Sequence, residues 1–297
     1  MTAPAGPDVR VRLATTLDDA RAVAAVFGEV WGQAGAGDAS MPVDLPMRVN
    51  TLRALAHSGG YVALAETAPG GRCVGASAAW LGRSGDGVPL LHSHMTGVVE
   101  ERQGGGVGLD LKRHQREWCL ERAIEVIEWT FDPLVRRNAW FNLARLGAVI
   151  DAYEIDFYGP MEDGVNRGDE SDRALATWHL ESAAARAALS GPTPLTRKAS
   201  DRLLLATHDD RPTVRAAPPT PETGDRRMLC EIPSDIVALR SVDAGAARAW
   251  RLALRATLGA AVASGWRAAG ITVDGAYVLV AQPAGVLWSL GNAKRAQ

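Results

Sequence analysis

The sequence predicts a mixed α/β (α+β) fold in which helices flank a mixed sheet. Three observations predict it. Stretches with the apolar alternation of strands are interspersed with stretches of helical spacing through residues 9–158. Three of the strand patterns follow one another across short turns, as in an antiparallel meander. The later strand patterns are separated by helical ones, which adds crossover connections to the meander.

The first strand and helix are marked by local sequence. Residues 9–13 alternate between apolar and basic side chains, which is typical of a strand. Thr16 is placed to cap the helix that follows, because Asp18 and Asp19 would lie in its first turn. A loop rich in glycine and alanine comes next, and a second helix is expected at residues 46–56.

The meander and the elements after it are marked by turns and caps. Pro- and Gly-containing turns separate the strands, and Gly147 is expected to cap the last helix of this part. The expected elements are strands at 61–65, 73–81 and 90–99, a helix at 109–123, a strand at 125–131, a helix at 135–146 and a strand at 148–158.

The sequence after residue 160 is less regular. It predicts a helix at residues 173–189 and a strand at 228–232, with proline-rich connectors between them. Asp243 is expected to cap a long alanine-rich helix that ends near Ser264. Residues 271–281 are expected to form a hairpin or a long strand, with a turn at Asp274-Gly275.

Two segments of the sequence are loosely similar to each other. The helix–glycine–strand pattern that ends at Val280 is similar to the one that ends at Tyr158, so a duplicated half-domain is left open. The expected organisation is a catalytic domain at 1–165, a helix and proline-rich connector at 166–225, and an α/β subdomain at 226–297.

Composition excludes several classes of protein. The chain has 297 residues, 47% of them hydrophobic, and a net charge of −2, which argues against nucleic acid or an anionic membrane as partner. No apolar run long enough to span a membrane and no secretory leader is found, so a cytoplasmic location is expected. Cys73, Cys119 and Cys230 lack metal-ligand spacing and are expected to be reduced, buried thiols.

The most informative stretch is the segment Gln103-Gly104-Gly105-Gly106-Val107-Gly108, which joins a strand to a helix. Glycines allow the backbone to approach a ligand closely, and a helix N-terminus carries free N–H groups and a partial positive charge. The segment therefore predicts a phosphate or pyrophosphate site. By itself it also fits a flexible surface turn, and it matches neither the P-loop nor the dinucleotide fingerprint.

With that loop after the fourth strand, the order of elements resembles the GNAT superfamily of acyl-CoA N-acyltransferases. The family signature Arg/Gln-x-x-Gly-x-Gly/Ala is matched by Gln103, Gly106 and Gly108. Asn138 at the start of a later helix and the Leu146-Gly147 pair at its end match the family as well. Further phrases resemble a branch with an extended C-terminus: 93–95, 129–134, 138–142 and 172–173.

The resemblance implies a site for acetyl-CoA or another acyl-CoA as co-substrate, without a metal. Backbone N–H groups of the glycine loop would hold the pyrophosphate, and the backbone of Val98 and Val99 would pair with the pantetheine amides. Asn138 and Phe141 would contact the same molecule. The implied cofactor-binding residues are Val98, Val99, Gln103, Gly104, Gly105, Gly106, Val107, Gly108, Asn138 and Phe141.

Acylation of an amine requires a base, because a free alkyl amine is mostly protonated at neutral pH. His92 and His94 lie two apart on one strand and are expected to face the same side, with Ser93 on the other. His94 is the first candidate for the base and Glu101 the second. A histidine held by core hydrogen bonds, a solvated glutamate and a water chain are the alternatives. The two histidines have no evident third metal ligand.

One residue departs from the family pattern. Many relatives carry a tyrosine, as the acid for the leaving thiolate, at the position that Leu143 occupies here. Either another group donates the proton, with Tyr153 and Tyr158 as substitutes, or the thiolate leaves unaided.

The acceptor side and the basic residues are less defined. Trp31, Asp172 and Arg173 are the expected substrate residues; the last two would order a loop or cap a helix. Two basic groups are interpreted either as solvated helix faces or as contacts of an anionic ligand; they are Lys112, Arg113 and Arg116, and Arg248, Arg251 and Arg255.

The expected function is transfer of an acetyl or larger acyl group, such as succinyl, from coenzyme A to a small amine or amino acid by direct attack. A non-catalytic acyl-CoA sensor and a GNAT-fold thioester hydrolase or decarboxylase are the alternatives. A homodimer is left open.

Overall fold

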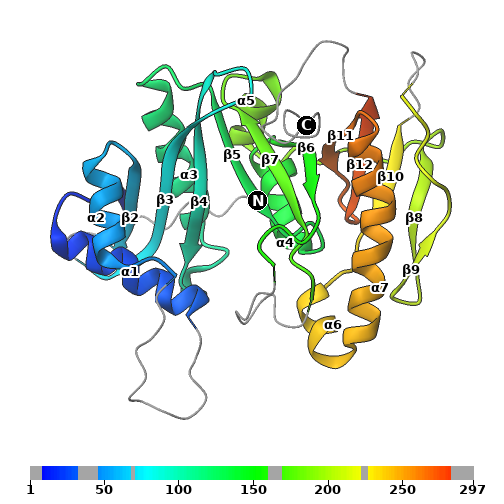
Figure 1. Cartoon of the computed structure of the whole chain (residues 1–297), viewed down its shortest axis with the longest axis horizontal. Helices are drawn as coiled ribbons and strands as arrows, with labels where there is room; N and C mark the ends of the chain where they lie inside the picture. The colour runs from blue at the N-terminus through cyan, green and yellow to red at the C-terminus, as the bar shows by residue number, and fades with distance from the viewer. Residues whose placement is uncertain (1–8, 33–45, 68–70, 160–168, 222–226, 282–297) are drawn as a thin grey trace. The chain divides into compact units, whose positions relative to one another are not determined.

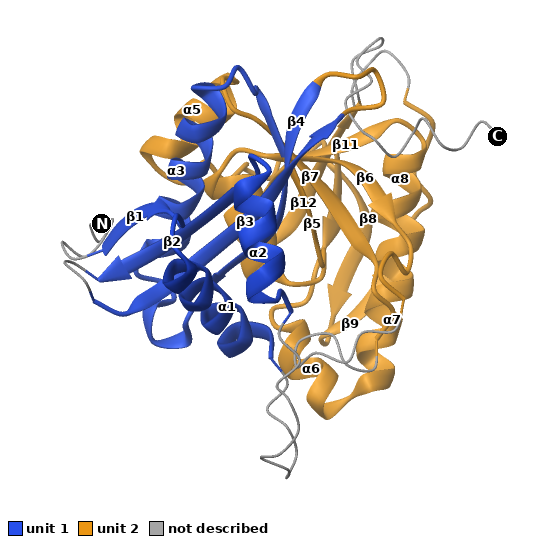
Figure 2. Cartoon of the chain, turned by 60° about the vertical axis from the view of Figure 1, so that its left-hand side comes forward, with its two compact units in different colours: residues 1–83, 89–127, 163–165 blue, residues 84–88, 128–162, 166–297 orange. Residues whose placement is uncertain are grey.

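The computed structural model describes residues 9–32, 46–67, 71–159, 169–221 and 227–281. The chain divides into two compact units, coloured in Figure 2. Unit 1 comprises residues 1–83, 89–127 and 163–165, and unit 2 comprises residues 84–88, 128–162 and 166–297.

Unit 1 contains the predicted meander (Figure 1). Its neighbouring strands are all antiparallel, in the order β1-β2-β3-β4. They are β1 (Val9–Leu13), β2 (Tyr61–Thr67), β3 (Cys73–Arg83) and β4 (Pro89–Val98). The helical elements are α1 (Leu17–Trp31), α2 (Val49–His57), the short η1 (Glu100–Arg102) and α3 (Val107–Leu120).

Helices cover both faces of this sheet. A Cβ added to Gly75 on β3 would meet Val107 of α3 at 2.9 Å, whereas one added to Gly97 on β4 would meet Trp31 of α1 at 2.8 Å. The two glycines lie on opposite faces, because Gly97 pairs with Ala76, the neighbour of Gly75. Close packing of both helices onto the sheet thus depends on small residues in β3 and β4.

The start of α1 confirms the predicted cap. The Thr16 side chain accepts a hydrogen bond from the N–H of Asp19, and the Asp19 carboxylate accepts one from the N–H of Thr16. Arg12 of β1 donates to Asp19 at 2.7 Å, and this bond holds the pKa of Asp19 well below its usual range. The cap therefore also joins α1 to the first strand.

Unit 2 has a mixed sheet in the order β5-β7-β6-β11-β12-β10-β8-β9. Strand β8 runs parallel to β10, whereas the pairs β6–β7, β6–β11, β11–β12, β10–β12 and β8–β9 are antiparallel. The strands are β5 (Val126–Phe131), whose first two residues fall in unit 1, β6 (Val149–Glu154), β7 (Arg173–His179), β8 (Arg202–His208), β9 (Arg211–Val214), β10 (Met228–Glu231), β11 (Trp266–Ile271) and β12 (Ala276–Ala281).

The helices of unit 2 include two π-helical stretches, η2 and η3. They are α4 (Arg136–Ala139), η2 (Trp140–Arg145), α5 (Ala183–Ser190), α6 (Ile236–Val242), α7 (Ala244–Leu254), η3 (Arg255–Gly259) and α8 (Ala260–Ala263). The Asp243 side chain accepts from the N–H of Ala246, which confirms the predicted cap of the long helix.

Unit 2 repeats one order of elements. Strand β5 is followed by a helix with a π-helical stretch and by the antiparallel pair β6–β7; strand β10 is followed by such a helix and by the pair β11–β12. The two pairs meet where Ile150 of β6 lies opposite Ala268 of β11. The strand order from β5 to β10 is thus a palindrome, as the duplicated half-domain would require.

Two predictions for the less regular part were wrong or incomplete. The helix predicted at 173–189 is a strand, β7, followed by the shorter α5. Six of the seven residues of β7 are buried between its neighbours β5 and β6, and this burial overrides the helix propensity of its alanines and leucine. The β8–β9 hairpin was not predicted. Its turn is formed by Asp209 and Asp210, both at positive φ, instead of by glycine.

Candidate functional site

The glycine loop lies between η1 and α3 in unit 1. Gly104 and Gly106 have φ of 77° and 91°, which only glycine adopts without strain, and Gly106 is the N-cap of α3. A Cβ added to Gly104 would meet no atom within 4 Å, so this side of the loop is open to a ligand. The predicted strand–glycine–helix arrangement is therefore confirmed.

The loop presents free backbone donors. The N–H groups of Gln103 and Gly105 donate to the carbonyls of Glu100 and Arg102. Within the described residues, the N–H groups of Gly104, Gly106, Val107 and Gly108 have no acceptor. Four donors at the N-terminus of a fourteen-residue helix form a site of the kind that binds phosphate oxygens.

The residues just before the loop have backbone partners of their own. The Gln103 side chain donates to the Val98 carbonyl at 3.1 Å, which closes the loop onto the end of β4. The Val99 N–H donates to Val74, and the Val99 carbonyl accepts from Arg102. The Val98 and Val99 carbonyls each keep a second lone pair for a ligand donor, whereas the Val99 N–H is already engaged.

Glu101 lies on η1 and is exposed to solvent. Its carboxylate is paired with Arg72, which also bonds Glu29 at 3.0 Å. Backbone hydrogen bonding and then the nearby Arg72 lower the pKa of Glu101. A carboxylate with a lowered pKa is a weaker proton acceptor.

His94 and His92 lie on one face of β4, as predicted, with Trp80 of β3 beside them. The ring centroid of Trp80 is 4.5 Å from that of His94 and 5.4 Å from that of His92. The His94 side chain is exposed and makes no hydrogen bond to another described residue. Partial desolvation by its surroundings, and then the neighbouring His92, lower the pKa of His94, which favours the neutral, proton-accepting imidazole.

Lys112 does not lie on a solvated face of α3 and is not placed to meet a phosphate. It is 3% exposed and donates to Ser93 Oγ at 2.8 Å and to Gln115 Oε1 at 3.1 Å. Burial lowers its pKa to about 7. Gln115 in turn bonds Ser77, and Ser77 bonds Thr96 at 2.9 Å, so a buried polar chain joins α3 to β3 and β4.

Trp31 ends α1 and packs under β4, with its ring against Gly97 and 5.6 Å from that of Phe27. Only Gly32 of the neighbouring loop lies within the described residues, so the predicted acceptor-pocket role of Trp31 stays a prediction.

Three predicted residues lie on the α4–η2 helix of unit 2. Asn138 is exposed and Phe141 is half-buried, whereas Leu143 is buried at 2% exposure. Leu143 is therefore an apolar core residue at the position where the family pattern would place a proton-donating tyrosine. Of the proposed substitutes, Tyr153 donates its hydroxyl to Asp172 at 2.7 Å, and burial raises its pKa well above the usual value.

Arg173 is the first residue of β7 and Asp172 directly precedes it, so capping of a helix is excluded as their role. Asp172 is fully buried and Arg173 is 5% exposed. The Arg173 guanidinium lies 5.4 Å from the ring centroid of Tyr158, whose hydroxyl is 2.9 Å from that of Thr130. These contacts support the loop-ordering interpretation of the pair.

The arginine stripe of α7 and η3 was interpreted either as a solvated helix face or as a contact of an anionic ligand, and for Arg251 the solvated face is wrong. Arg251 is 1% exposed and bonds both oxygens of Asp132 at 2.9 Å. Arg255 bonds Asp172, and only Arg248 is largely exposed. The anionic partners of the stripe belong to the chain itself.

The cysteines are free thiols: Cys119 and Cys230 are buried and Cys73 is partly buried. Burial raises the pKa of each, to about 11 for Cys73 and about 12 for the other two. None of them is a ready nucleophile. Among the described His, Cys, Asp and Glu residues, no group of three is placed to hold a metal ion.

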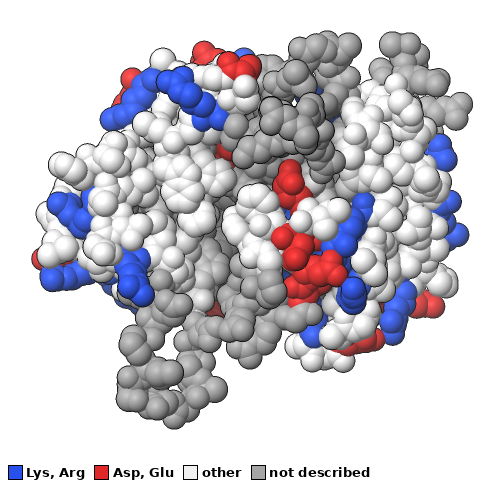
Figure 3. All heavy atoms as spheres, in the orientation of Figure 1, with Lys and Arg blue, Asp and Glu red and all other residues white. Residues whose placement is uncertain are grey.

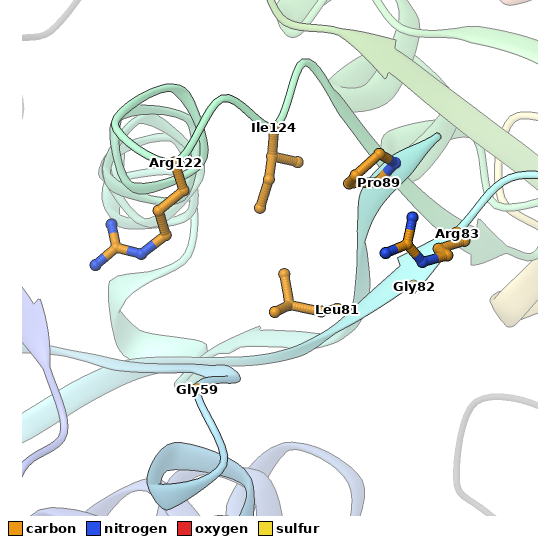
Figure 4. A pocket seen from close by; sticks show the side chains of 7 residues that line it. All are labelled: Gly59, Leu81, Gly82, Arg83, Pro89, Arg122 and Ile124. Carbon is orange, nitrogen blue, oxygen red and sulfur yellow. The ribbon is translucent and has the colours of Figure 1, made fainter. Parts of the chain in front are cut away.

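A shallow hollow of about 560 Å³ lies in unit 1 near the far end of α3 (Figure 4). Leu81 and Ile124 point toward one another across it, and Arg83 and Arg122 flank it. The Arg122 guanidinium lies 4.2 Å above the Trp118 ring and bonds the Trp118 carbonyl. The hollow contains none of the predicted site residues.

Asp151 is a titratable residue that sequence reasoning missed. It lies at an irregular step in the β6–β7 register and is 6% exposed. Thr177 donates to its Oδ1 at 2.9 Å, and its Oδ2 has no partner within the described residues. Burial and, to a smaller extent, the charge of Glu128 raise its pKa to about 7. The sequence signal that could have identified Asp151 is a single aspartate inside an apolar strand pattern.

Replacing Asp151 with asparagine is expected to change the pH dependence of stability. Because the pKa of Asp151 is raised in the folded state, ionising this residue lowers the free energy of unfolding. The loss is absent below about pH 4 and grows to roughly 4 kcal/mol as the pH rises to about 7. Urea unfolding between pH 4 and 8 should show this decline in the wild type and a flatter curve in Asp151→Asn. Asp209→Asn is the control, because the Asp209 side chain is exposed, and its stability should decline with pH as in the wild type. Equal slopes of stability against pH in the wild type and both variants would contradict the prediction.

The chain is similar to solved N-acetyltransferase structures. One from Staphylococcus aureus has 11% identity and a TM-score of 0.43, over 59% of this chain and 99% of that one. The Escherichia coli ribosomal-protein-S18-alanine N-acetyltransferase has 12% identity and a TM-score of 0.42, over 59% and 96%. Arabidopsis thaliana Naa50, in complex with a bisubstrate analogue, has 18% identity and a TM-score of 0.42, over 57% and 97%. No protein-family model and no curated protein sequence matches the chain.

Across the described part of the chain, none of the helices has the length and apolar character needed to cross a membrane.

Proposed function

We propose that the chain is an acyl-CoA-dependent N-acyltransferase that moves an acetyl or larger acyl group, such as succinyl, to a small amine or amino acid. The observation that carries the proposal is the glycine loop. Four of its N–H groups have no acceptor among the described residues, two of its glycines have positive φ, and it lies between β4 and α3; these features fit a diphosphate. The match of Gln103, Gly106 and Gly108 to the family signature supports coenzyme A as the diphosphate.

The proposed reaction is direct transfer. The amine nitrogen forms a bond to the thioester carbonyl carbon, the carbon–sulfur bond breaks with its electron pair going to sulfur, and the amine proton passes to a base. No described cysteine has the lowered pKa that a covalent intermediate would require. Holding both reactants in place then supplies much of the rate.

His94 is the proposed base. Its imidazole is exposed, has a lowered pKa and makes no hydrogen bond to another described residue, which suits proton acceptance at neutral pH. No acid is assigned to the leaving thiolate, because Leu143 is apolar, the Tyr153 hydroxyl donates a hydrogen bond to Asp172, and the Tyr158 hydroxyl is hydrogen-bonded with that of Thr130. A thiol is acidic enough to leave as the thiolate without such help.

His94→Ala is expected to lower kcat by roughly 100-fold or more at neutral pH. In the wild type, activity should fall as the pH drops through the His94 pKa, which lies below 6.5, because the protonated ring cannot accept a proton. The variant should lack this limb of the pH–rate profile. His92→Gln is the matched control: it should keep kcat within a few-fold and move the limb to higher pH. An unaltered profile in His94→Ala would remove His94 as the base.

The proposal is tested by calorimetry with coenzyme A, followed by measurement of thiol release from acetyl-CoA and succinyl-CoA with pooled amines. Binding together with amine-dependent release and an acylated product supports the acyltransferase. Release that needs no amine indicates a thioester hydrolase or decarboxylase. Binding without turnover indicates an acyl-CoA sensor, and absence of binding refutes the assignment.

A further inference from the structure

The proposed base lies at an irregular point of β4 in unit 1. Two residues of β4, Ser93 and His94, lie opposite a single residue of β3, Ala79. The pairs on either side of them are Met95 with Ala78 and His92 with Trp80. This arrangement is a β-bulge, in which one strand carries an extra residue and the ladder between the strands is locally interrupted. A bulge changes the direction of the side chains at the extra residue, and here it includes His94.

The position of the bulge decides which face of the sheet His94 occupies. Side chains of a strand alternate between the two faces, so a shift of one residue in the pairing moves a side chain to the opposite face. If the bulge moved by one residue toward the start of β4, His94 would lie directly opposite Ala79. Ala79 shares a face with Ser77, which bonds Gln115 of α3. His94 would then point at α3 instead of lying beside Trp80.

The His94 side chain has little support of its own. Its imidazole makes no hydrogen bond to another described residue, and its neighbour is the Trp80 ring, at a centroid distance of 4.5 Å. In the view of Figure 3, the surface over the middle of β3 and β4 carries few charged side chains that could hold it by an ion pair. The direction of the imidazole therefore depends on the backbone of the bulge.

The buried polar chain holds β4 on both sides of the proposed base. On one side, the Lys112 amine of α3 donates to Ser93 Oγ at 2.8 Å. On the other side, the Thr96 hydroxyl is 2.9 Å from that of Ser77, and Gln115 donates to Ser77 Oγ at 3.3 Å. Lys112 also donates to Gln115 Oε1 at 3.1 Å, and this bond joins the two sides.

Burial makes this chain sensitive to the position of the bulge. Its inner members, Lys112, Gln115, Ser77 and Ser93, are at most 3% exposed. A polar group that lost its partner there would not regain one from water without a rearrangement, and this is costly. A Ser93 side chain turned to the other face would deprive Lys112 of one partner. The amine makes both bonds whether it is protonated or neutral, because a neutral amine still has two N–H groups.

We propose that Lys112 is a positioning residue that holds the β4 bulge in place and thereby keeps the His94 imidazole on the exposed face beside Trp80. Lys112 acts through its hydrogen bond to Ser93 and, at the far end of the polar chain, through Thr96. Because it is 3% exposed, it acts through the strand and not on the reactants. The role of His94 as the base rests on the proposed function; the role of Lys112 in fixing the bulge does not.

Proton NMR of the imidazoles tests the positioning without any measurement of activity. Lys112→Met keeps the length of the side chain and removes its N–H donors, and His94→Ala identifies the signals of His94. In the wild type, the Trp80 ring displaces the signals of the His94 ring protons, because the two rings are 4.5 Å apart. This displacement should be lost in Lys112→Met. Lys198→Met, the same substitution at an exposed lysine of unit 2, is the matched control and should retain the displacement.

Kinetics with an amine acceptor test whether the positioning matters for the reaction. Lys112→Met should lower kcat by roughly tenfold or more and keep the Kd for coenzyme A within a few-fold of the wild type. Because both substitutions act on the same base, the double variant Lys112→Met/His94→Ala should be no slower than His94→Ala alone. A loss of structure elsewhere would slow the double variant further.

Ser93→Ala is the second variant, because it removes the acceptor at the bulge and leaves Lys112 bonded to Gln115. It should displace the His94 signals even if Lys112→Met fails to fold. Ser93→Thr keeps the hydroxyl and should stay close to the wild type in both measurements.

Wild-type His94 signals in every folded variant of Lys112→Met and Ser93→Ala overturn the positioning role. Altered signals with an unchanged kcat overturn its importance for the reaction. If the wild type neither binds coenzyme A nor acylates any amine, the proposed function fails, while the NMR signals still decide the role of Lys112.

Discussion

Gly106→Val is expected to raise the Kd for coenzyme A by roughly 100-fold or more, because at least two charge-assisted hydrogen bonds of about 1.5 kcal/mol each would be lost. Gly106 has φ of 91° at the N-cap of α3. A β-branched residue is strongly disfavoured there, so the loop would refold locally and turn its N–H groups away from the ligand. Isothermal titration calorimetry with coenzyme A measures the effect.

Gly87→Val provides the control for backbone strain. Gly87 has φ of 86° in the turn between β3 and β4, and a Cβ there would meet no atom within 4 Å. The two variants should lose similar amounts of folding stability, whereas only Gly106→Val should lose affinity. Wild-type affinity in Gly106→Val would disprove the diphosphate site at this loop.

Arg251→Met is expected to lower the free energy of unfolding by about 3–5 kcal/mol, the usual cost of leaving a buried ion-pair partner uncompensated. Although burial raises the pKa of Asp132, Arg251 and Arg240 hold it at about 2, so the carboxylate is ionised at neutral pH. Methionine keeps the length of the side chain and removes its charge. Urea unfolding at pH 7 gives the difference.

Arg248→Met should change the free energy of unfolding by no more than about 1 kcal/mol, because its ion pair with Glu170 is largely exposed to solvent. The difference between the two variants distinguishes the effect of breaking the buried ion pairs from the effect of removing any one arginine from the helix. A loss below about 1 kcal/mol in Arg251→Met would show that the buried ion pairs do not hold unit 2 together.

Local patterns were sufficient for the first part of the fold. The strands of unit 1 were predicted because each has an apolar pattern bounded by glycine or proline turns. The caps at Thr16 and Asp243 followed from side chains next in sequence to their helices. Strand β7 did not follow, because its seven residues owe their conformation to the strands on either side of them.

The parts of the candidate site that depend on the backbone of neighbouring residues could be predicted from the sequence. The parts that depend on charged side chains and on partners far away in the sequence could not. The glycine loop is a property of consecutive residues, and the shared face of His92 and His94 follows from the two-residue period of a strand. The burial of Lys112 and Arg251 depends on partners 19 and 119 residues away, which no local pattern contains. Their roles therefore required the folded chain.

The palindromic strand order of unit 2 also bears on solubility. If the chain stopped after β7, strand β6 would become the outermost strand, with unpaired N–H and C=O groups on the side where Ile150 now faces Ala268. Such an open edge invites pairing with a second molecule and aggregation. Strand β11, from the second half of the repeat, pairs with that edge within the same chain, so no second molecule is needed to cover it.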